Sequence, residues 1–363
     1  MAEDDIETPA LIIDLDAFDA NLETMRRRAF ELGVALRAHG KTHKSADVAR
    51  AQVERGGAVG VCCQKVAEAE AFVRGGISDV LVSNQITQPS KIARLANLSK
   101  RARVTVCVDD ASNVAALNDA ARMSDTNLGV LVEIDVGAGR CGVAPGAPAV
   151  ELARAISNAP NLTFCGLQAY NGSAQHIADY AERARVVERV VADAKQTRNM
   201  IIAAGLPCDT VTGAGTGSYA FEGASGVYTE IQCGSYIFMD VGYRDIDGEG
   251  GAYMPAFRHA LFILTSVMSH AKADTAICDA GLKSQSTDSG LARVFDRTDI
   301  AYEKASDEHG TIADPGGVLN VNDRIKLIPN HVDPTCNMHD WFVGVRNGVV
   351  ECVWPVSGRG KAY

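Results

Sequence analysis

The chain has 363 residues, of which 47% are hydrophobic and 22% charged. This composition is that of a globular protein with a large core, so a disordered chain is excluded. Acidic residues outnumber basic ones 45 to 35, and the net charge of -10 argues against nucleic acid and anionic membranes as partners. No stretch of about 18 apolar residues occurs and residues 1–9 are acidic, so we expect a cytoplasmic protein.

Short β-rich runs alternate with helical patterns over roughly residues 10–240. Apolar residues three or four positions apart predict helices at 16–32, 67–73, 114–123, 150–156 and 180–202. The eight predicted strands are 34–38, 58–63, 79–83, 103–108, 128–134, 163–169, 209–212 and 230–238. This alternation predicts an α/β fold, a parallel (β/α)8 TIM barrel, which we assign to residues 10–244.

The pattern changes after residue 245. A glycine-rich stretch with Gly248, Gly250 and Gly251 leads to β-rich runs without long helices between them, at 260–269, 275–279, 324–328, 341–346 and 349–354. Asn347-Gly348 between the last two runs is a strong signal for a type I′ hairpin. We therefore expect residues 245–363 to form a C-terminal all-β domain, which residues 1–9 are expected to join.

The ten cysteines lie inside apolar runs such as Val61-Cys62-Cys63, and the sequence has no CxxC pair. In a reducing compartment such residues behave as small hydrophobic side chains. We expect buried thiols and no disulfides.

In a barrel, catalytic groups gather where the strands end. Chemically rich residues follow the predicted strands at Lys41, Gln64, Arg140, Tyr170, His176, Gly215 to Ser218, Gln232, Gly234, Ser235 and Tyr236. The turn Gly215-Thr216-Gly217-Ser218 offers backbone N–H groups and two hydroxyls, which suit a phosphate at the loops after strands seven and eight. The alternatives are a flexible connection and, less well matched, a dinucleotide fingerprint, because no acidic ribose ligand follows.

Lys41 stands across the predicted barrel mouth from this turn. It could be an ordinary solvated lysine. At a strand end, however, a partly desolvated lysine loses its charge readily and attacks a carbonyl. A lysine of this kind together with a phosphate site indicates the cofactor pyridoxal 5′-phosphate (PLP).

Six motifs stand in a fixed order along the chain: Glu7-Thr8-Pro9-Ala10-Leu11 with Asp14-Leu15-Asp16, His39-Gly40-Lys41-Thr42-His43-Lys44, Gly139-Arg140-Cys141-Gly142, Gly215-Thr216-Gly217, Gly234-Ser235-Tyr236 and Asn330-His331-Val332-Asp333. Over nearly its whole length the chain resembles the alanine racemase-like PLP enzymes, and among them the D-threonine aldolase and D-serine dehydratase group. The resemblance implies a (β/α)8 barrel with a C-terminal β domain, and a homodimer.

The resemblance also implies roles for single residues. Lys41 would form the Schiff base with PLP, and Lys44 is the poorer candidate because it lies beyond the strand end. Arg140 would contact the phenolic oxygen of the cofactor, the alternative being a structural loop arginine. The further cofactor contacts would be Gln64, Tyr170, Gly215, Thr216, Gly217, Gly234, Ser235 and Tyr236.

Gln232 stands where the wider superfamily has Arg or Glu facing the pyridine nitrogen. A neutral partner would leave that nitrogen largely unprotonated and the ring a weaker electron sink. This favours one committed bond cleavage over racemisation. The alternative is a glutamine packed in a core strand.

The stretch from His331 to His339 holds four potential metal ligands, which could form a structural zinc site. The spacing favours a different site. His331 and Asp333 alternate on one face of an expected extended segment, whereas Cys336 follows a Pro-Thr turn and His339 leads into a strand. In the family that the chain resembles, dehydratases have His-x-Cys at this position and aldolases have His-x-Asp. One imidazole and one carboxylate suit Mn²⁺ or Mg²⁺, with Zn²⁺ as a further candidate.

The function that follows is retro-aldol cleavage of a small-molecule D-3-hydroxy amino acid. 3-Hydroxy-D-aspartate would give glycine and glyoxylate, and D-threonine would give glycine and acetaldehyde. His176, where the family places a histidine, is the expected base for the β-hydroxyl proton; a surface histidine is the alternative.

Three other functions stay open at this point. The first is a dehydratase on the same scaffold, against which Asp333 argues. The second is a non-catalytic PLP carrier, which would lack the C-terminal β domain and the metal pair. The third is a binding module for D-amino acids without turnover.

Overall fold

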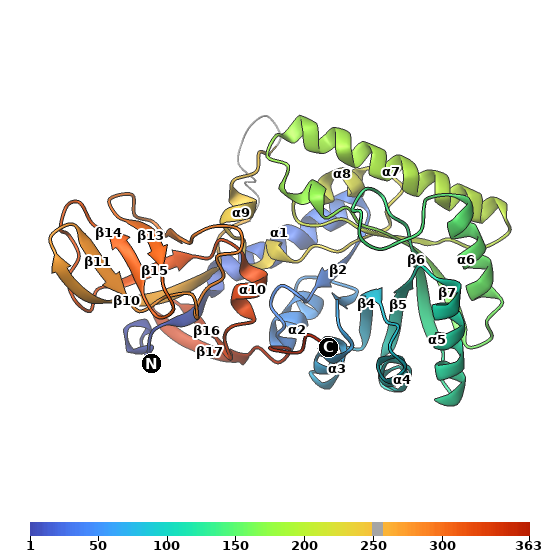
Figure 1. Cartoon of the computed structure of the whole chain (residues 1–363), viewed down its shortest axis with the longest axis horizontal. Coiled ribbons are helices and arrows are strands. Elements are labelled where there is room, and N and C mark those ends of the chain that lie inside the picture. The colour runs from blue at the N-terminus through green and yellow to red at the C-terminus, as the bar shows by residue number, and fades with distance from the viewer. Residues whose placement is uncertain (249–256) are drawn as a thin grey trace.

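The computed structural model describes residues 1–248 and 257–363, and it has two lobes (Figure 1). In one lobe, eight parallel strands close into a barrel in chain order. They are β2 (Ala35–His39), β3 (Gly60–Cys63), β4 (Asp79–Gln85), β5 (Arg103–Val108), β6 (Leu128–Glu133), β7 (Leu162–Ala169), β8 (Thr210–Gly213) and β9 (Glu230–Ile231). The predicted TIM barrel is confirmed. The predicted glycines Gly250 and Gly251 lie outside the described residues.

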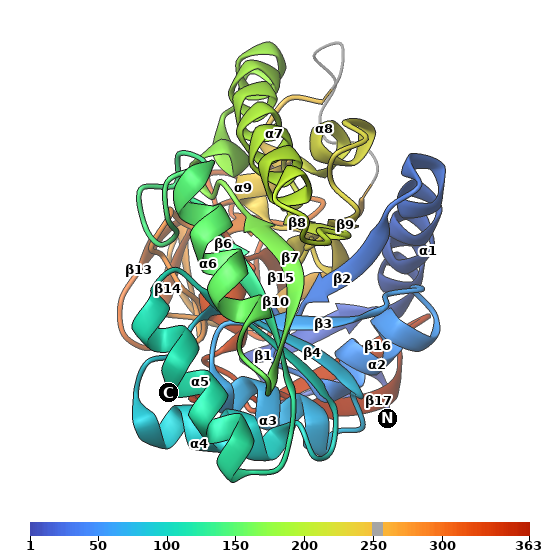
Figure 2. The same ribbon diagram turned by 90° about the vertical axis from the view of Figure 1, so that its right-hand side faces the viewer.

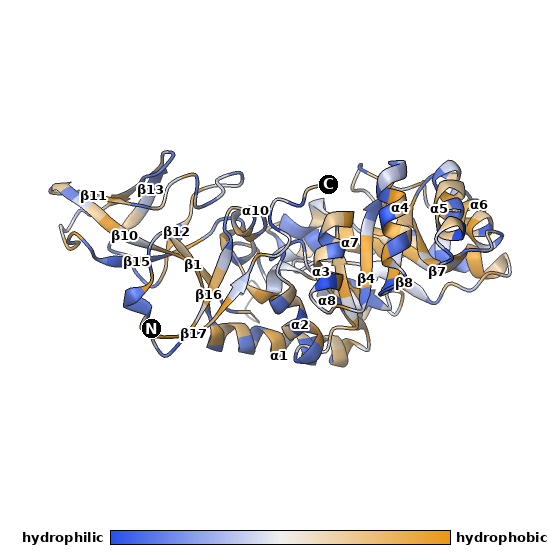
Figure 3. Ribbon diagram, turned by 90° about the horizontal axis from the view of Figure 1, so that it is seen from below, coloured by the Kyte–Doolittle hydropathy of each residue, from blue (hydrophilic) through white to orange (hydrophobic). Residues whose placement is uncertain are grey.

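Helices surround the barrel, as the view toward it shows (Figure 2). They are α1 (Leu15–Leu32), α2 (Ala46–Glu54), α3 (Val66–Arg74), α4 (Pro89–Leu98), α5 (Ala111–Met123), α6 (Ala147–Ser157), α7 (Tyr180–Ala203) and α8 (Tyr219–Ala224). Local chemistry fixes their ends. In α1, for example, the Asp14 side chain accepts from the N–H groups of Asp16 and Ala17, and Gly33 ends the helix at a φ of 67°. Hydrophobic residues concentrate in barrel strands such as β4 and β7 (Figure 3).

The second lobe is a nine-stranded sheet with the main order β13-β14-β11-β10-β1-β16-β17. Outside this order, β15 pairs with β10, and β12 pairs with β15. Its strands are β1 (Ala10–Asp14), β10 (Leu261–Lys272), β11 (Thr275–Cys278), β12 (Arg293–Val294), β13 (Ala301–Ala305), β14 (Gly310–Ala313), β15 (Arg324–Ile328), β16 (Trp341–Arg346) and β17 (Val349–Pro355). The predicted hairpin is present, with Asn347 at φ 50° and Gly348 at φ 72°. The strand-rich character of the C-terminal lobe is confirmed, although the lobe also contains a short helix at residues 332–336, and β12, β13 and β14 were not predicted.

Two segments differ from their predictions. Strand β1 was not predicted, and it pairs antiparallel with β10 and parallel with β16, so the start of the chain is built into the second lobe. Strand β9 is far shorter than the predicted 230–238. After it the chain turns at Gly234, where a Cβ would stand 2.4 Å from Oγ1 of Thr42, and continues as the 3₁₀ helix η3 (Ser235–Ile237). The division of the chain at residue 245 stays a prediction.

One hydrophobic core contains residues of both lobes. It joins Phe18 of α1 and Phe238 after η3 to Phe342 of β16 and Val332 of α10 (Val332–Cys336). The rings of Phe18 and Phe238 lie 6.3 Å apart, and those of Phe238 and Phe342 lie 5.5 Å apart. The junction between the lobes is therefore packed, and the strand-end loops of the barrel open beside it.

All ten cysteines are free and seven of them are buried, as expected. In the described ranges, none of the helices combines the length and the apolar character needed to cross a bilayer.

Candidate active site

The loop after β2 carries Lys41 at the junction of the lobes. Lys41 follows Gly40, where a Cβ would stand 2.4 Å from Cζ of Phe72, so the loop packs too closely for any larger residue. The Lys41 side chain remains 41% exposed, and its Nζ lies 3.0 Å from Oδ2 of Asp333. The negative charge of Asp333 raises the pKa of Lys41 above its usual value. The expectation that burial makes this lysine lose its charge readily is therefore wrong, because the carboxylate outweighs desolvation. Lys41 thus presents its amine at the barrel mouth, opposite the second lobe.

Lys44 is held inside the structure instead. Its Nζ lies 3.1 Å from Oε1 of Glu68 and donates to Oδ1 of Asn337 at 3.0 Å. Its carbonyl oxygen accepts a hydrogen bond from the N–H of Gly358 at 2.7 Å. Since both its side chain and its backbone are engaged, Lys44 anchors the C-terminal segment and does not offer an amine to the barrel mouth.

His331 and Asp333 lie at the beginning of α10. The prediction that this segment is extended is wrong, because Val332–Cys336 form a short helix with Pro334 in its first turn, where proline costs no helical hydrogen bond. His331 stands at the N-cap in extended backbone. Burial raises the pKa of Asp333, but the charges of Lys41 and His331 overcome this and lower it to about 2. Asp333 therefore faces the space in which Lys41 ends, and His331 precedes it at the N-cap of the same helix.

The donor atoms at this point fit a divalent cation. Nδ1 of His331 lies 2.8 Å from Oδ2 of Asp288, which leaves the other ring nitrogen for an ion. Oδ1 of Asp333 is buried and has no hydrogen-bond partner among the described residues. An imidazole nitrogen and an unpaired carboxylate oxygen are ligands that Mn²⁺, Mg²⁺ and Zn²⁺ accept.

The other potential ligands of the same stretch are engaged elsewhere. Cys336 is fully buried, and Nε2 of His339 lies 2.7 Å from the carbonyl oxygen of Ser284. Across residues 1–248 and 257–363, no three His, Cys, Asp or Glu side chains come together as a metal cluster. The four candidate ligands between His331 and His339 accordingly do not form a closed four-ligand site.

The turn after β8 packs against the loop that follows β7. Oε1 of Gln175 accepts from the N–H of Gly217 at 3.0 Å, and a Cβ at Gly217 would stand 2.2 Å from the carbonyl oxygen of Gln175. The N–H groups of Gly215 and Thr216 have no acceptor in the described part of the chain. Two N–H groups of this turn, and not three, are therefore available to a phosphate.

The segment Gly234-Ser235-Tyr236 lies beside this turn. The N–H of Tyr236 donates to Oγ1 of Thr216 at 3.0 Å, whereas those of Gly234 and Ser235 have no acceptor among the residues described. The Tyr236 side chain is fully buried, and its hydroxyl accepts from Nε2 of Gln52 at 3.2 Å. The unpaired N–H groups of this segment and of the turn form the candidate phosphate site, while the Tyr236 ring belongs to the core.

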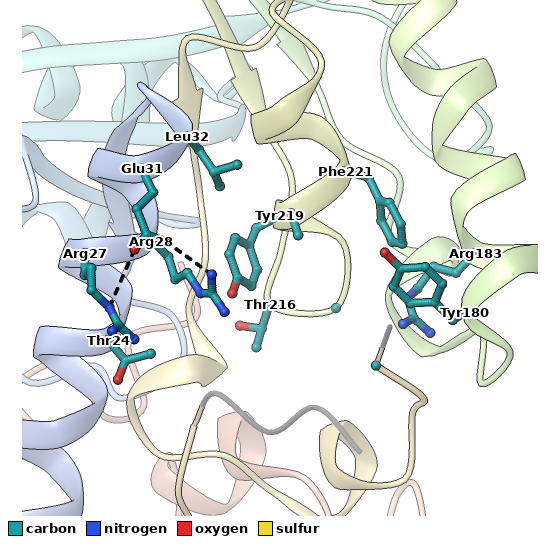
Figure 4. Close-up of a pocket in the computed structure, with 13 residues that line it drawn as sticks. Thr24, Arg27, Arg28, Glu31, Leu32, Tyr180, Arg183, Thr216, Tyr219 and Phe221 are labelled. Carbon is teal, nitrogen blue, oxygen red and sulfur yellow. Dashed lines mark hydrogen bonds and ion pairs between the residues drawn. The ribbon is translucent and has the colours of Figure 1, made fainter. Parts of the chain in front are cut away.

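The same turn also borders a second space. Thr216 and Gly217 line a cavity of about 530 Å³ between α1, α8 and the beginning of α7. Figure 4 shows Arg28 and Tyr219 directed into it, with Tyr180 on the opposite wall. The turn thus borders this cavity, although Thr216 itself is only 1% exposed.

Arg140 and Tyr170 approach each other at the barrel mouth. The guanidinium carbon of Arg140 lies 5.9 Å from the ring centroid of Tyr170, a cation–π distance. Asp135 folds the Arg140 loop, because its Oδ1 accepts from the N–H of Gly139 at 3.1 Å. Burial raises the pKa of Tyr170, and the positive charges of Lys41 and Arg140 oppose this shift. These side chains therefore surround one space.

Gln64 and Gln232 belong to two separate hydrogen-bond networks. Nε2 of Gln64 lies 3.1 Å from Nε2 of His39 at the end of β2. Gln232 is buried, and its Nε2 donates to Oγ1 of Thr212 at 2.9 Å and to Oε1 of Gln168 at 2.6 Å. That Gln232 faces a pyridine nitrogen stays a prediction, since its amide is engaged with barrel side chains.

His176, the predicted base, ends the 3₁₀ helix η2 (Ser173–His176). Its ring centroid lies 5.0 Å from that of Tyr243 in α9 (Val241–Arg244). Burial lowers the pKa of His176, and the positive charges of His331 and Lys41 lower it further. A neutral imidazole can accept a proton, so His176 remains a candidate base.

Sequence reasoning missed two aspartates that contact the site. Asp288 is hydrogen-bonded to His331, and Oδ2 of Asp240 accepts from the N–H of Val332 at 3.1 Å. They are 43 and 92 residues away from these partners in the chain, so no local motif connects them. An aspartate before a helix is a signal for an N-cap, and Asp240 is the N-cap of α9, but the sequence analysis predicted no helix there.

Comparison with known proteins places the chain among relatives. It matches the family model for the alanine racemase N-terminal domain over residues 13–241 and that for a putative serine dehydratase domain over residues 260–345. It is 56% identical to a 3-hydroxy-D-aspartate aldolase of Paracoccus denitrificans (strain Pd 1222), covering 100% of this chain and 95% of the relative. It is 43% identical to a D-threonine aldolase of Arthrobacter sp, covering 98% and 93%.

A solved structure shows the same likeness in three dimensions. The crystal structure of D-threonine aldolase from Filomicrobium marinum has a TM-score of 0.96 at 46% sequence identity, covering 99% of this chain and 98% of that one.

The buried histidine of the lysine loop predicts a pH effect on stability. His43 is fully buried, its Nδ1 accepts from the N–H of Ser45 at 3.0 Å, and burial lowers its pKa to about 4. Because the unfolded chain takes up this proton near pH 6.5 and the folded chain does not, the folded state should lose up to about 3 kcal/mol as the pH falls from 6.5 to 4. In thermal melts over this range, His43→Gln should show a weaker dependence than wild type.

The control is His309→Gln, which changes an exposed histidine. It should keep the wild-type slope. Equal slopes for wild type and His43→Gln would contradict the prediction.

Proposed function

The chain belongs to the alanine racemase-like family, whose members use PLP as a cofactor, and we propose that it is an aldolase that cleaves D-3-hydroxy amino acids with PLP and a divalent cation. The relatives named above favour 3-hydroxy-D-aspartate as a substrate, with glycine and glyoxylate as products, and D-threonine as a second one. The homodimer implied by the resemblance is part of the proposal.

The observation that carries this proposal is the position of Asp333. Its carboxylate lies 3.0 Å from Nζ of Lys41 with one oxygen unpaired, and the charges of Lys41 and His331 lower the pKa of this carboxyl. A hard carboxylate oxygen beside an imidazole suits an ion that keeps open positions for a substrate hydroxyl, such as Mn²⁺ or Mg²⁺. This supports the aldolase over a dehydratase, which would have a cysteine here.

The residues around Lys41 fit PLP. The unpaired N–H groups of Gly215, Thr216, Gly234 and Ser235 would bind the phosphate, and the Lys41 amine would bind the aldehyde. When bound, the cofactor withdraws electrons from Cα of the substrate and so eases rupture of the Cα–Cβ bond.

The residues that would hold PLP would bring a substrate into the space between Lys41 and Asp333 of α10, whose charged atoms lie 3.0 Å apart. A cation held by His331 and Asp333 would supply Lewis acidity at that hydroxyl. His176, kept neutral at ordinary pH by its lowered pKa, would accept the hydroxyl proton. The Cα–Cβ bond then breaks, the β-carbon leaves as an aldehyde, and Cα takes up a proton to give glycine.

The two lysines of the loop give the first test. Lys41→Ala should abolish covalent attachment of PLP, because it removes the amine at the barrel mouth, whereas Lys44→Ala should retain attachment even where it lowers stability. Attachment is measured by borohydride reduction followed by peptide mass spectrometry. A reduced adduct on Lys44 in the wild-type protein would overturn the assignment.

The metal pair gives the second test. Asp333→Ala or treatment with EDTA should lower the cleavage rate at least about 100-fold, because Lewis acidity at the hydroxyl contributes several kcal/mol. PLP attachment and the thermal melt should change little, and Mn²⁺ or Mg²⁺ should restore the EDTA-treated protein. The matched control, Cys336→Ser, should keep its metal dependence.

Product analysis with 3-hydroxy-D-aspartate separates the two enzyme classes. Glycine with glyoxylate supports the aldolase. Oxaloacetate with ammonia would make the protein a dehydratase, and full activity after verified metal removal would contradict the role of the cation.

A further inference from the structure

Asp240 is a buried carboxylate between the barrel and the second lobe. Its side chain is 1% exposed, and it follows η3 on the barrel side of the junction. Oδ1 accepts from the N–H of Tyr243 at 3.0 Å, and Oδ2 accepts from the N–H of Val332 at 3.1 Å. One side chain therefore caps two helices, α9 and α10, from different parts of the chain.

The bond to Val332 replaces a cap that α10 lacks. A helix usually begins at a Ser, Thr, Asp or Asn whose side chain accepts an N–H of the first turn. The N-cap of α10 is His331, and its side chain makes no such bond. Because Asp240 satisfies the first N–H of α10 from outside, the His331 imidazole can turn away from its own helix toward Asp288 and the metal site.

The hydrogen bond from the N–H of Tyr243 to Asp240 fixes helix α9, which packs against the candidate base His176. The Tyr243 ring lies 5.0 Å from the ring of His176, centroid to centroid. A Cβ at the neighbouring Gly242 would stand 3.8 Å from Cε1 of His176 and 3.6 Å from the carbonyl oxygen of Asn330. The helix α9 thus fills the space between the candidate base and the residues that precede the metal pair.

Backbone bonds reinforce this contact. The N–H of Val241 donates to the carbonyl oxygen of Pro329 at 3.2 Å, and that of Gly242 donates to the carbonyl oxygen of Asn330 at 3.3 Å. A helix of five residues such as α10 has little stability of its own, so its orientation depends on contacts of this kind.

We infer that Asp240 is a positioning residue, which holds the metal pair of α10 at a fixed place relative to His176 by capping α9 and α10 together. The inference rests on the proposed function, because it takes His331 and Asp333 as metal ligands. Asp240 itself touches neither the substrate nor the cation.

The test is the substitution Asp240→Asn, measured as Mn²⁺ binding to the PLP-loaded protein by the electron paramagnetic resonance signal of free Mn²⁺. Asparagine keeps the volume and one acceptor, but its NH₂ group faces one of the two N–H donors. Loss of a hydrogen-bond partner that helps to orient the metal-binding residues typically weakens metal binding about 10- to 100-fold. We expect a rise of this size in the Mn²⁺ dissociation constant, with PLP attachment retained.

The control is Asp245→Asn. Asp245 lies at the end of the same helix, is exposed, and pairs with Arg293 at the surface. It should bind Mn²⁺ as the wild type does, even where it shifts the melting temperature.

A second variant breaks the same contact from the other side. Val332→Pro removes the N–H that donates to Asp240, and proline is favourable at the first position of a helix. His331 already has the extended backbone, φ -136° and ψ 116°, that a residue before proline requires. This variant should also weaken Mn²⁺ binding at least about tenfold. It tests the positioning role of Asp240 if the Asp240→Asn protein does not fold.

The outcomes separate this inference from the proposed function. If the wild-type protein binds no Mn²⁺, the proposed function and the inference fall together. If the wild type binds Mn²⁺ and the folded Asp240→Asn and Val332→Pro variants bind it within about twofold of wild type, the positioning role alone is overturned.

Discussion

The ion pair between Lys41 and Asp333 joins the two lobes at the point where the chemistry is proposed to occur. The lysine comes from the loop after β2 of the barrel and the carboxylate from α10 of the second lobe, and their charged atoms lie 3.0 Å apart. The proposed PLP site in the barrel loops and the proposed cation site in α10 can act on one substrate if this distance is maintained. The shared core and the double cap of Asp240 are the contacts that maintain it.

Much of the fold could be predicted because its signals are local. Runs of β-branched residues between amphipathic stretches identified all eight barrel strands, and Asn347-Gly348 identified the last hairpin. The elements that were predicted wrongly depend on contacts between residues that lie far apart in the chain. Strand β1 is five residues long and pairs with strands more than 200 residues away, and no pattern in residues 10–14 shows those partners. Residues 232–238 were predicted as a strand because the segment ends in the β-favouring run Tyr236-Ile237-Phe238. The close approach of Gly234 to Thr42 turns the chain instead.

The residues of the candidate site also fall into two groups, those that local motifs indicate and those that only the fold brings together. Lys41, His331 and Asp333 stand in short motifs, so the sequence and the resemblance indicated them before the structure was known. Asp240 and Asp288 are single aspartates whose partners lie 92 and 43 residues away, and folding alone brings them together. The helical form of α10 was missed because Pro334 suggested a break, whereas proline in a first turn is compatible with a helix.

The most direct test of the account is anomalous diffraction from crystals of the PLP-loaded protein soaked in Mn²⁺. The account predicts one strong Mn²⁺ peak at about 2.0 to 2.3 Å from Nε2 of His331 and from a carboxylate oxygen of Asp333, with Asp288 still bound to the other ring nitrogen. A peak at Cys336 and His339, or no peak within reach of Asp333, would contradict it.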